Sequence, residues 1–399
     1  MSLRDRLKTL VNAPDKRLLV RRVVASAAPR LGRGPTLEHA LHDTWEWLRR
    51  AHDATPDDGV SAMFSLAVGW TASYPETTGY LIPTLLSYAR SEEQPEALER
   101  ALRMARWECD VQLPDGAVRS GWMSDPPAPA VFNTGQVLFG WLAAAREAER
   151  EGEAADAARF RDAAARAARW LVEHQDADGA WRRSLSASAT SPVQAYNVRS
   201  AWGLALAGKA LGEPAWVEAA ERNARWTLSR QDRDGWFKDT AFLPGEPPPL
   251  HTIAYVLEGL VGLGQLLGDE RFVLSAGRAA TPFTEALELG VSLAGAYDEG
   301  FTPAARWRCL TGEAQLSLVL GRLARHAPRH ARWRPLARRL LEGLVRLQPR
   351  SGDDVKGALA GSEPVWGAYC GFAYPNHAAK FLLDALLLEL RDLDVQAPA

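Results

Sequence analysis

Cysteine, net charge and long apolar runs are what this sequence of 399 residues has little of. Its three cysteines, Cys109, Cys309 and Cys370, are an odd number without metal-ligand spacing, which argues against a disulfide framework and for a reducing compartment. A formal net charge of −2 gives no sign of nucleic-acid binding. No apolar run reaches the roughly eighteen residues of a membrane-spanning helix, and no apolar signal core follows the first Met. We therefore expect a cytoplasmic protein that does not bind nucleic acid.

Motifs for cofactors and metals are absent too. The sequence has no phosphate-binding glycine loop, no clustered His/Cys zinc pattern and no Gly-x-Ser-x-Gly elbow. The runs Asp176–Gly179 and Asp232–Gly235 resemble the start of a calcium loop but lack the Glu expected at its twelfth position, so they are interpreted as turns. We predict no metal and no cofactor.

Tryptophan, by contrast, is abundant at fifteen residues, and some of these residues mark a repeat. Trp170–Trp181 (WLVEHQDADGAW) and Trp226–Trp236 (WTLSRQDRDGW) each place a Gln five residues after a Trp, followed by an Asp-Gly turn, and Trp107–Gly116 keeps this spacing. The pattern predicts a helix with a buried Trp, an end at the Gln, whose side chain satisfies backbone groups there, and a sharp turn. Weaker copies at Trp47–Gly59, near 285–300 and at Gln348–Gly352 complete six units of about 60 residues.

Each unit is long enough for two helices and two loops. We predict outer helices, rich in Ala, Leu, Arg and Glu, over residues 36–53, 95–112, 155–175, 214–231, 270–288 and 329–348. Inner helices, more apolar and containing small residues, are predicted over 77–91, 133–150, 195–211, 251–267, 310–326 and 376–391. The expected fold is all-α, an (α/α)6 barrel over residues 35–399, with an open solenoid as the alternative.

Residues 1–34 stand apart, with nine positive and two negative side chains around a few apolar residues. One interpretation is a basic segment that docks on a membrane surface or a protein partner. The interpretation that we favour is a helix that lies on the ring with its charges in water.

The long loops, which lead from outer to inner helices, are where we expect a site. In a ring they emerge on one face, so polar residues at the inner-helix starts would converge there, near helix N-termini whose field favours anions. A Ser, Thr or Asn at such a start is often only an N-cap. Caps do not need the Tyr, His, Arg and Glu residues that accompany them in one loop after another.

Roles follow from side-chain chemistry. Two carboxylates across a cleft suit glycoside hydrolysis, and Tyr or His suits proton transfer at a sugar carbon. The predicted catalytic residues are Glu76, His251, Tyr74, Tyr196, Glu313 and Asp298. The predicted substrate-binding residues are Asn133, Gln136, Asn197, Arg199, Tyr255, Trp307, Tyr374, Asn376 and Lys380. Exposed Trp70, Trp122, Trp307 and Trp366 would stack on sugar rings, with core packing as the alternative for each of them.

The Trp-x4-Gln-x2-Asp-Gly repeats resemble the Gln-Trp repeats of the terpenoid cyclase and prenyltransferase α/α toroid superfamily. The ring of six hairpins is equally similar to the six-hairpin glycosidase, polysaccharide lyase and uronyl epimerase group. The chain lacks the Asp-x-Asp-Asp run of a squalene- or hopene-type cyclase and the zinc ligands of a prenyltransferase β-subunit. The loops Ser73–Tyr80, Pro249–Tyr255 and Tyr374–Lys380 also resemble those of α/α-barrel proteins from bacterial exopolysaccharide gene clusters, a similarity that implies no particular reaction.

We therefore expect a carbohydrate-active enzyme that acts on an acidic glycan or glycan precursor by metal-independent acid/base chemistry, with glycosidic bond cleavage as the first choice. A uronate lyase or C5-epimerase, a terpene-cyclase-like enzyme and a non-catalytic glycan- or partner-binding toroid are the alternatives. The oligomeric state is left open.

Overall fold

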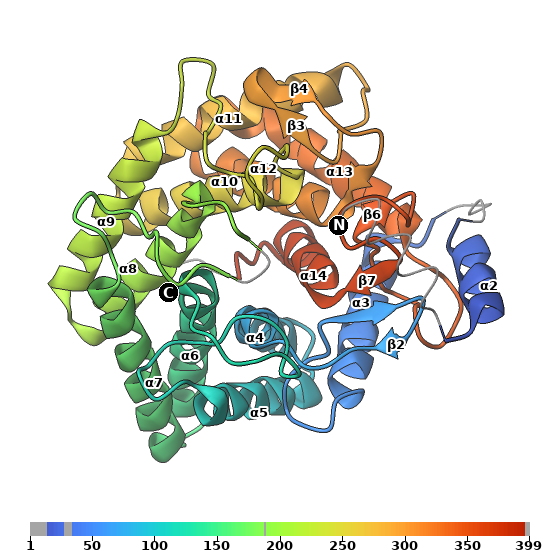
Figure 1. Cartoon of the computed structure of the whole chain (residues 1–399). Coiled ribbons are helices and arrows are strands. Elements are labelled where there is room, and N and C mark those ends of the chain that lie inside the picture. Colours follow the sequence, from blue (N-terminus) through green and yellow to red (C-terminus); the bar gives the residue numbers. More distant parts are fainter. Residues whose placement is uncertain (1–13, 28–33, 187–188, 396–399) are drawn as a thin grey trace.

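Twelve helices form a closed double ring in the computed structural model, which describes residues 14–27, 34–186 and 189–395. The outer ring consists of α3 (Leu37–Asp53), α5 (Pro95–Val111), α7 (Ala154–Glu173), α9 (Pro214–Ser229), α11 (Glu270–Glu288) and α13 (Arg334–Leu347). The inner ring consists of α4 (Pro75–Ser91), α6 (Val131–Arg150), α8 (Val198–Leu211), α10 (Leu250–Leu267), α12 (Leu310–His326) and α14 (Asn376–Arg391). Each inner helix contacts the next, and α14 contacts α4, which closes the ring (Figure 1).

The prediction of an (α/α)6 toroid is therefore confirmed, and the open solenoid is wrong. Helix bounds agree within a few residues; the main difference is that the last outer helix begins at Arg334, after the 3-10 helix η3 (Pro328–Trp333). Short strands that the sequence did not predict connect the long loops. They form three small sheets from β1 (Met63–Ser65), β2 (Gly69–Trp70) and β7 (Ala373–Pro375), from β3 (Tyr297–Asp298) and β4 (Thr302–Pro303), and from β5 (Arg308–Cys309) and β6 (Ser362–Glu363).

Small residues let the inner helices pack closely, as predicted. A Cβ on Gly262 of α10 would lie 2.2 Å from the indole of Trp202 on α8. A Cβ on Gly140 of α6 would lie 2.3 Å from the carbonyl oxygen of Gly79 on α4. Because neither neighbour is the mobile end of a flexible chain, these positions accept only Gly at the present spacing. α10 is also the one described helix long and apolar enough for a membrane span, but 83% of its apolar window is buried in the ring.

The repeated Gln connects neighbouring units, which corrects the predicted role of a simple helix cap. Gln175 Nε2 donates to the carbonyl of Gly179 in its own turn, at 3.1 Å, and to the carbonyl of Ala219 on the next outer helix, at 2.9 Å. Its Oε1 accepts from Arg222 of that helix at 3.0 Å. Gln231 repeats all three contacts, with Gly235, Ser275 and Arg278. One amide thus holds a turn and two adjacent helices together.

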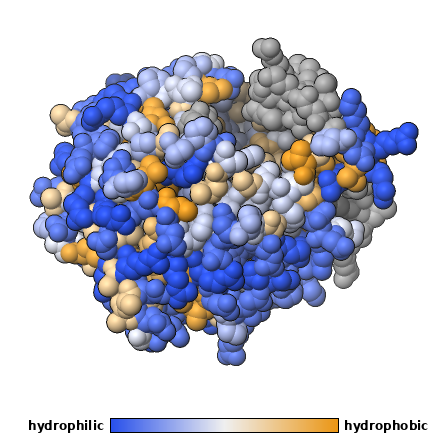
Figure 2. All heavy atoms as spheres, turned by 60° about the horizontal axis from the view of Figure 1, so that its bottom comes forward, coloured by the Kyte–Doolittle hydropathy of each residue, from blue (hydrophilic) through white to orange (hydrophobic). Residues whose placement is uncertain are grey.

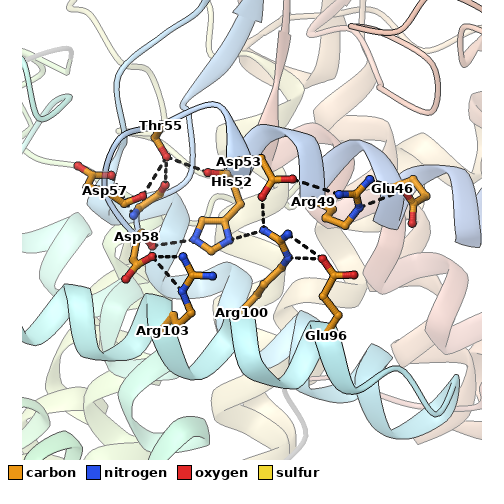
Figure 3. A network of polar contacts seen from close by, with 11 residues as sticks. Glu46, Arg49, His52, Asp53, Thr55, Asp57, Asp58, Glu96, Arg100 and Arg103 are labelled. Atoms are coloured by element: carbon orange, nitrogen blue, oxygen red, sulfur yellow. Dashed lines mark hydrogen bonds and ion pairs between the residues drawn. The ribbon is translucent and has the colours of Figure 1, made fainter.

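The first unit has His52, shown with its partners in Figure 3, where four other units have Gln112, Gln175, Gln231 and Gln348. His52 Nε2–H donates to the carbonyl of Asp58 at 3.2 Å, and Nδ1 accepts from Arg100 Nη1 at 3.1 Å. Arg100 also binds Asp53 at 2.6 Å, and Arg103 binds Asp58. The imidazole thus occupies the position of an amide and repeats two of its three contacts, the one to its own turn and the one to an Arg of the next outer helix. This geometry requires the neutral form of His52.

Candidate active site

A cavity of about 600 Å³ lies inside the ring, on the side where the inner helices begin. Inner-helix starts contribute one wall, and the long loops contribute the rest. Its lining comprises Met63, Tyr74, Glu76, Tyr80, Ser120, Gly121, Trp122, Asp125, Phe132, Ser186, Ala189, Tyr196, Phe242, His251, Tyr255, Ala368, Tyr369, Cys370 and His377. Five of the predicted site residues are among them, namely Tyr74, Glu76, Tyr196, His251 and Tyr255. These five come from the first, third and fourth predicted inner-helix starts, and Phe132 and His377 add the second and the sixth.

Glu76 is the buried carboxyl group of this cavity. It is the second residue of α4, is 8% exposed, and accepts a hydrogen bond from the Tyr74 hydroxyl at 2.5 Å. Burial raises the pKa of Glu76 to about 7, against the opposing effects of the Tyr74 hydrogen bond and the Arg199 charge. Near neutral pH this carboxyl group is therefore divided between a proton donor and a proton acceptor, which suits general acid–base catalysis.

His251, the second residue of α10, is held in one orientation. Its Nδ1 lies 2.6 Å from Oε1 of Gln315, so Nδ1 carries the proton and Nε2 is left as an acceptor toward the cavity. Burial, with a contribution from the nearby His377, keeps the pKa of His251 well below its usual value. His251 is therefore a neutral imidazole at neutral pH, able to accept a proton.

A second imidazole, His377, pairs with a tyrosine. Tyr369 hydroxyl and His377 Nε2 are 2.9 Å apart, and the His251 and His377 rings lie 5.5 Å apart by their centroids. Burial lowers the pKa of His377 to about 3. The cavity thus holds two neutral imidazoles beside the Glu76 carboxyl.

Aromatic side chains make up much of the remaining wall. The Tyr255 ring lies 4.9 Å from that of Phe132 and 4.3 Å from that of His251. Burial raises the pKa of Tyr74, Tyr196 and Tyr255 well above the usual value, so these hydroxyls donate and accept hydrogen bonds but carry no charge. Such a wall suits the apolar faces and hydroxyl edges of sugar rings.

Trp122 and Asp125 belong to one loop at the edge of the cavity. Asp125 Oδ2 accepts from the backbone N–H of Trp122 at 2.7 Å, and the Asp125 side chain is exposed. Trp122, one of the predicted sugar-stacking residues, lines the cavity. Trp70 instead packs against Trp47, with 5.5 Å between centroids.

Two predicted substrate ligands lie in ion pairs beneath the cavity. Arg199 is fully buried; its Nε lies 2.8 Å from Glu258 Oε2, and its guanidinium lies 5.3 Å from the Tyr255 ring centre. Lys380 Nζ lies 2.6 Å from Asp384 Oδ2, also fully out of water. Neither cation lines the cavity, although the charge of Arg199 acts to lower the pKa of Glu76.

The remaining polar helix starts support the loops. Asn133 Nδ2 donates to the Arg119 carbonyl at 2.9 Å, and Asn376 Nδ2 donates to the Ser61 carbonyl at 3.0 Å. Gln136 Nε2 lies 3.3 Å from Ser200 Oγ. Two further predicted ligands, Asn197 at the end of η1 (Ala195–Asn197) and Tyr374 in β7, are buried. None of the five residues lines the cavity.

The fifth predicted start lies outside the cavity. Arg308 holds the Glu313 carboxylate with two hydrogen bonds, at 2.8 and 2.6 Å, and also binds Glu363. Trp307 packs against Gly295 and Gly367. Asp298 is exposed in the β3–β4 hairpin. The structure therefore does not bring Glu313, Asp298 or Trp307 to the other candidates.

Sequence reasoning did not select several residues of the lining. His377 directly follows the predicted ligand Asn376 at the start of the last inner helix, so its position in the sequence could have predicted it as a site residue. Ser120, Asp125, Tyr369 and Cys370 lie in loops without periodicity, and no pattern marks them.

No known protein-family profile and no curated protein sequence matches the chain. Solved structures do match. A heparin-specific unsaturated glucuronyl hydrolase has a TM-score of 0.67 at 16% identity, with 90% of this chain and 98% of that chain covered. The unsaturated glucuronyl hydrolase of Bacillus sp. GL1, responsible for glycosaminoglycan degradation, gives 0.68 at 15% identity over the same shares. A Streptococcus agalactiae variant of such an enzyme, complexed with dGlcA-GalNAc6S, gives 0.65 at 13%, with 94% and 95% covered.

These similarities establish the fold. The chain has the α/α toroid of the six-hairpin glycosidases, one of the groups that the sequence resembles.

Proposed function

We propose that the chain is a glycoside hydrolase that cleaves a glycosidic bond in an acidic glycan, with Glu76 as the proton donor. The main support is a buried carboxyl group, with a pKa of about 7, in the wall of an aromatic cavity. The shared fold adds to this support, since the similar structures are named as glucuronyl hydrolases and one of them is complexed with dGlcA-GalNAc6S. The inner-helix N-termini around the cavity provide a field that favours an anionic sugar.

The arrangement favours a reaction that one weak acid can start. Asp125, the other carboxylate in the lining, is exposed and already accepts the Trp122 N–H. An unsaturated uronate contains an enol ether, whose carbon–carbon double bond is basic enough for such an acid. Glu76 would give its proton to the double-bond carbon that bears no ring oxygen, which leaves an oxygen-stabilised cation at the other carbon. Water would attack this cation while His251 Nε2 accepts the water proton. The hemiketal formed would open to a ketone, which leaves a hemiacetal at the anomeric carbon. Collapse of that hemiacetal to an aldehyde would break the bond to the remaining sugar and release it as an alcohol.

The lyase and epimerase alternatives fit less well. Both remove a proton beside a carboxylate and need a cation to stabilise the enolate. Arg199, the predicted cation, is already neutralised by Glu258 at 2.8 Å and lies beneath the wall. The cavity tyrosines, whose pKa is raised by burial, are also poorly suited to remove a proton as phenolates.

A terpene-cyclase reaction fits less well for a different reason. Aromatic walls suit carbocations, but protonating an isolated alkene needs a strong acid, and a carboxyl group with a pKa of about 7 is a weak one. The weakness of Glu76 as an acid therefore favours an oxygen-substituted substrate.

The test is a set of uronate oligosaccharides with saturated and unsaturated non-reducing ends, assayed with wild type, Glu76→Gln and Glu218→Gln. Glu218 is an exposed carboxylate on α9, so its change controls for loss of charge. We expect new reducing ends, with loss of ultraviolet absorbance when the end is unsaturated, abolished only in Glu76→Gln. A gain of absorbance would establish a lyase, and deuterium exchange without cleavage an epimerase. Full activity in Glu76→Gln would refute the assigned acid.

A further inference from the structure

Exposed apolar side chains gather at one corner of the molecule. The helix α2 (Lys16–Ala27) lies against the outside of the ring, and Leu18, Val20 and Val24 on it are 39%, 60% and 63% exposed. Val68, in the turn between β1 and β2, is 62% exposed. Figure 2 shows apolar side chains beside charged ones at the right-hand edge, the side on which α2 lies in Figure 1.

Basic residues accompany these apolar ones. Lys16, Arg17 and Arg21 are exposed on α2, and none of them forms an ion pair with a described residue. Leu19, only 2% exposed, and Arg22 face the ring instead; Arg22 binds the Leu66 carbonyl at 3.2 Å and Asp354 at 3.4 Å. α2 therefore uses one side to dock on the ring and presents the other, both cationic and apolar, to the surroundings.

This corner adjoins the cavity. Leu66, which Arg22 contacts, donates its N–H to the Phe372 carbonyl at 2.9 Å, so the β1–β2 hairpin is bound to the loop that precedes β7. That loop carries Trp366, which is 43% exposed, and Tyr369, which lines the cavity. Met63 of β1 lines the cavity as well. Whatever binds the corner therefore lies beside the substrate site.

We propose that α2, together with Val68 and Trp366, docks on the surface of an anionic lipid bilayer. Cationic side chains bind anionic headgroups, while exposed aliphatic and Trp side chains enter the boundary between headgroups and acyl chains. Within the basic segment 1–34, residues 1–13 and 28–33 lie outside the described residues, and the first of these stretches adds Arg4, Arg6 and Lys8 to the basic charge of the sequence. Cations that pair with no described residue, interspersed with apolar side chains, favour a lipid surface over a protein partner. The inference goes beyond the proposed reaction and does not depend on it.

The experiment is sedimentation of the full chain with vesicles of phosphatidylcholine alone or mixed with phosphatidylglycerol. We expect binding to the mixed vesicles only, weakened by salt. Arg17→Glu with Arg21→Glu removes two cations, so binding should weaken about tenfold or more. Val20→Ser with Val24→Ser should also weaken binding, although the charge is unchanged.

Matched controls change the same chemistry elsewhere. Leu289 and Val291, after α11, are 82% and 54% exposed, and Leu289→Ser with Val291→Ser should bind like wild type. Arg169→Glu with Arg233→Glu makes the same change in charge at two exposed positions away from α2. This variant should bind the mixed vesicles more strongly than Arg17→Glu with Arg21→Glu. The proposal is overturned if wild type does not bind, binds both vesicle types alike, or is weakened equally by the α2 variants and their controls. Because the assay measures no catalysis, it succeeds or fails independently of the proposed function.

Discussion

His52 makes the first repeat sensitive to acid, in a way that a single substitution tests. Its side chain is 3% exposed and satisfies Asp58 and Arg100 only as the neutral imidazole. Burial, followed by the charges of Arg100 and Arg103, lowers the pKa of His52 to about 4. A Gln at this position would donate to Asp58 and accept from Arg100 without titrating, as Gln175 and Gln231 do in their own units.

The size of the effect follows from linkage. An unfolded chain binds the proton with a pKa of about 6.5, and the folded chain with a pKa of about 4, so protonation favours unfolding. The contribution of neutral His52 to the free energy of unfolding is fully present above about pH 6.5, and it is lost as the pH falls toward 4. At about pH 5 the free energy of unfolding has fallen by about 2 kcal/mol through His52. Below the pKa of His52 in the folded chain, this fall approaches about 3 kcal/mol.

Urea unfolding of wild type and His52→Gln at about pH 7.5 and about pH 5 measures this loss. We expect the variant to lose about 2 kcal/mol less than wild type over that interval. The other buried imidazoles, His251 and His377, destabilise both chains alike at low pH, so the difference isolates His52. His42→Gln, at an exposed position of the same helix, is the control and should behave as wild type. Equal acid losses in wild type and His52→Gln would refute the assignment of the neutral imidazole.

Three more outcomes can be measured. If Glu76 is the acid, kcat/KM falls as the pH rises past about 7, the pKa that burial gives this group; a rate that rises through this range would contradict the assignment. Arg199→Met leaves Glu258 buried without its partner and should cost about 3 to 5 kcal/mol in urea unfolding, whereas a change below about 1 kcal/mol would show that the pair matters little. Trp122→Ala should raise KM about tenfold with kcat nearly constant, and a fall in kcat alone would count against a stacking role.

The fold could be predicted because the outer helices repeat a local motif, clearly in three units and more weakly in the others. The Trp, Gln and Asp-Gly positions recur at a nearly constant spacing, and the apolar periodicity extends over whole helices. The partners of the Gln amide could not be predicted, because the carbonyl of Ala219 belongs to another unit, 44 residues beyond Gln175. Only the packing of neighbouring outer helices brings these two groups together.

The site could be predicted in part, since the inner-helix starts do converge. Which start residues reach the cavity depends on the rotation of each helix, and spacing does not give that rotation. Glu76 and Arg199 are both the second residue of their helices, yet Glu76 lines the cavity and Arg199 points beneath it. The 3-10 turn η1 before α8 places Tyr196, rather than Arg199, in the cavity wall. Tyr369 and Cys370 depend on a loop whose path includes a left-handed residue, with φ of 45° at Cys370.

One physical cause can supply both the acid and the base of the proposed reaction. Removing water disfavours charge, so it raises the pKa of a carboxyl group and lowers the pKa of an imidazole. In this cavity it brings the pKa of Glu76 to about 7 and keeps that of His251 well below its usual value, and burial is the largest effect on each. Both groups can therefore be uncharged at the same neutral pH, one carrying a proton to donate and the other an open nitrogen to accept one. A cavity that admitted bulk water would lose both states together, because a solvated Glu76 would ionise and a solvated His251 would begin to protonate.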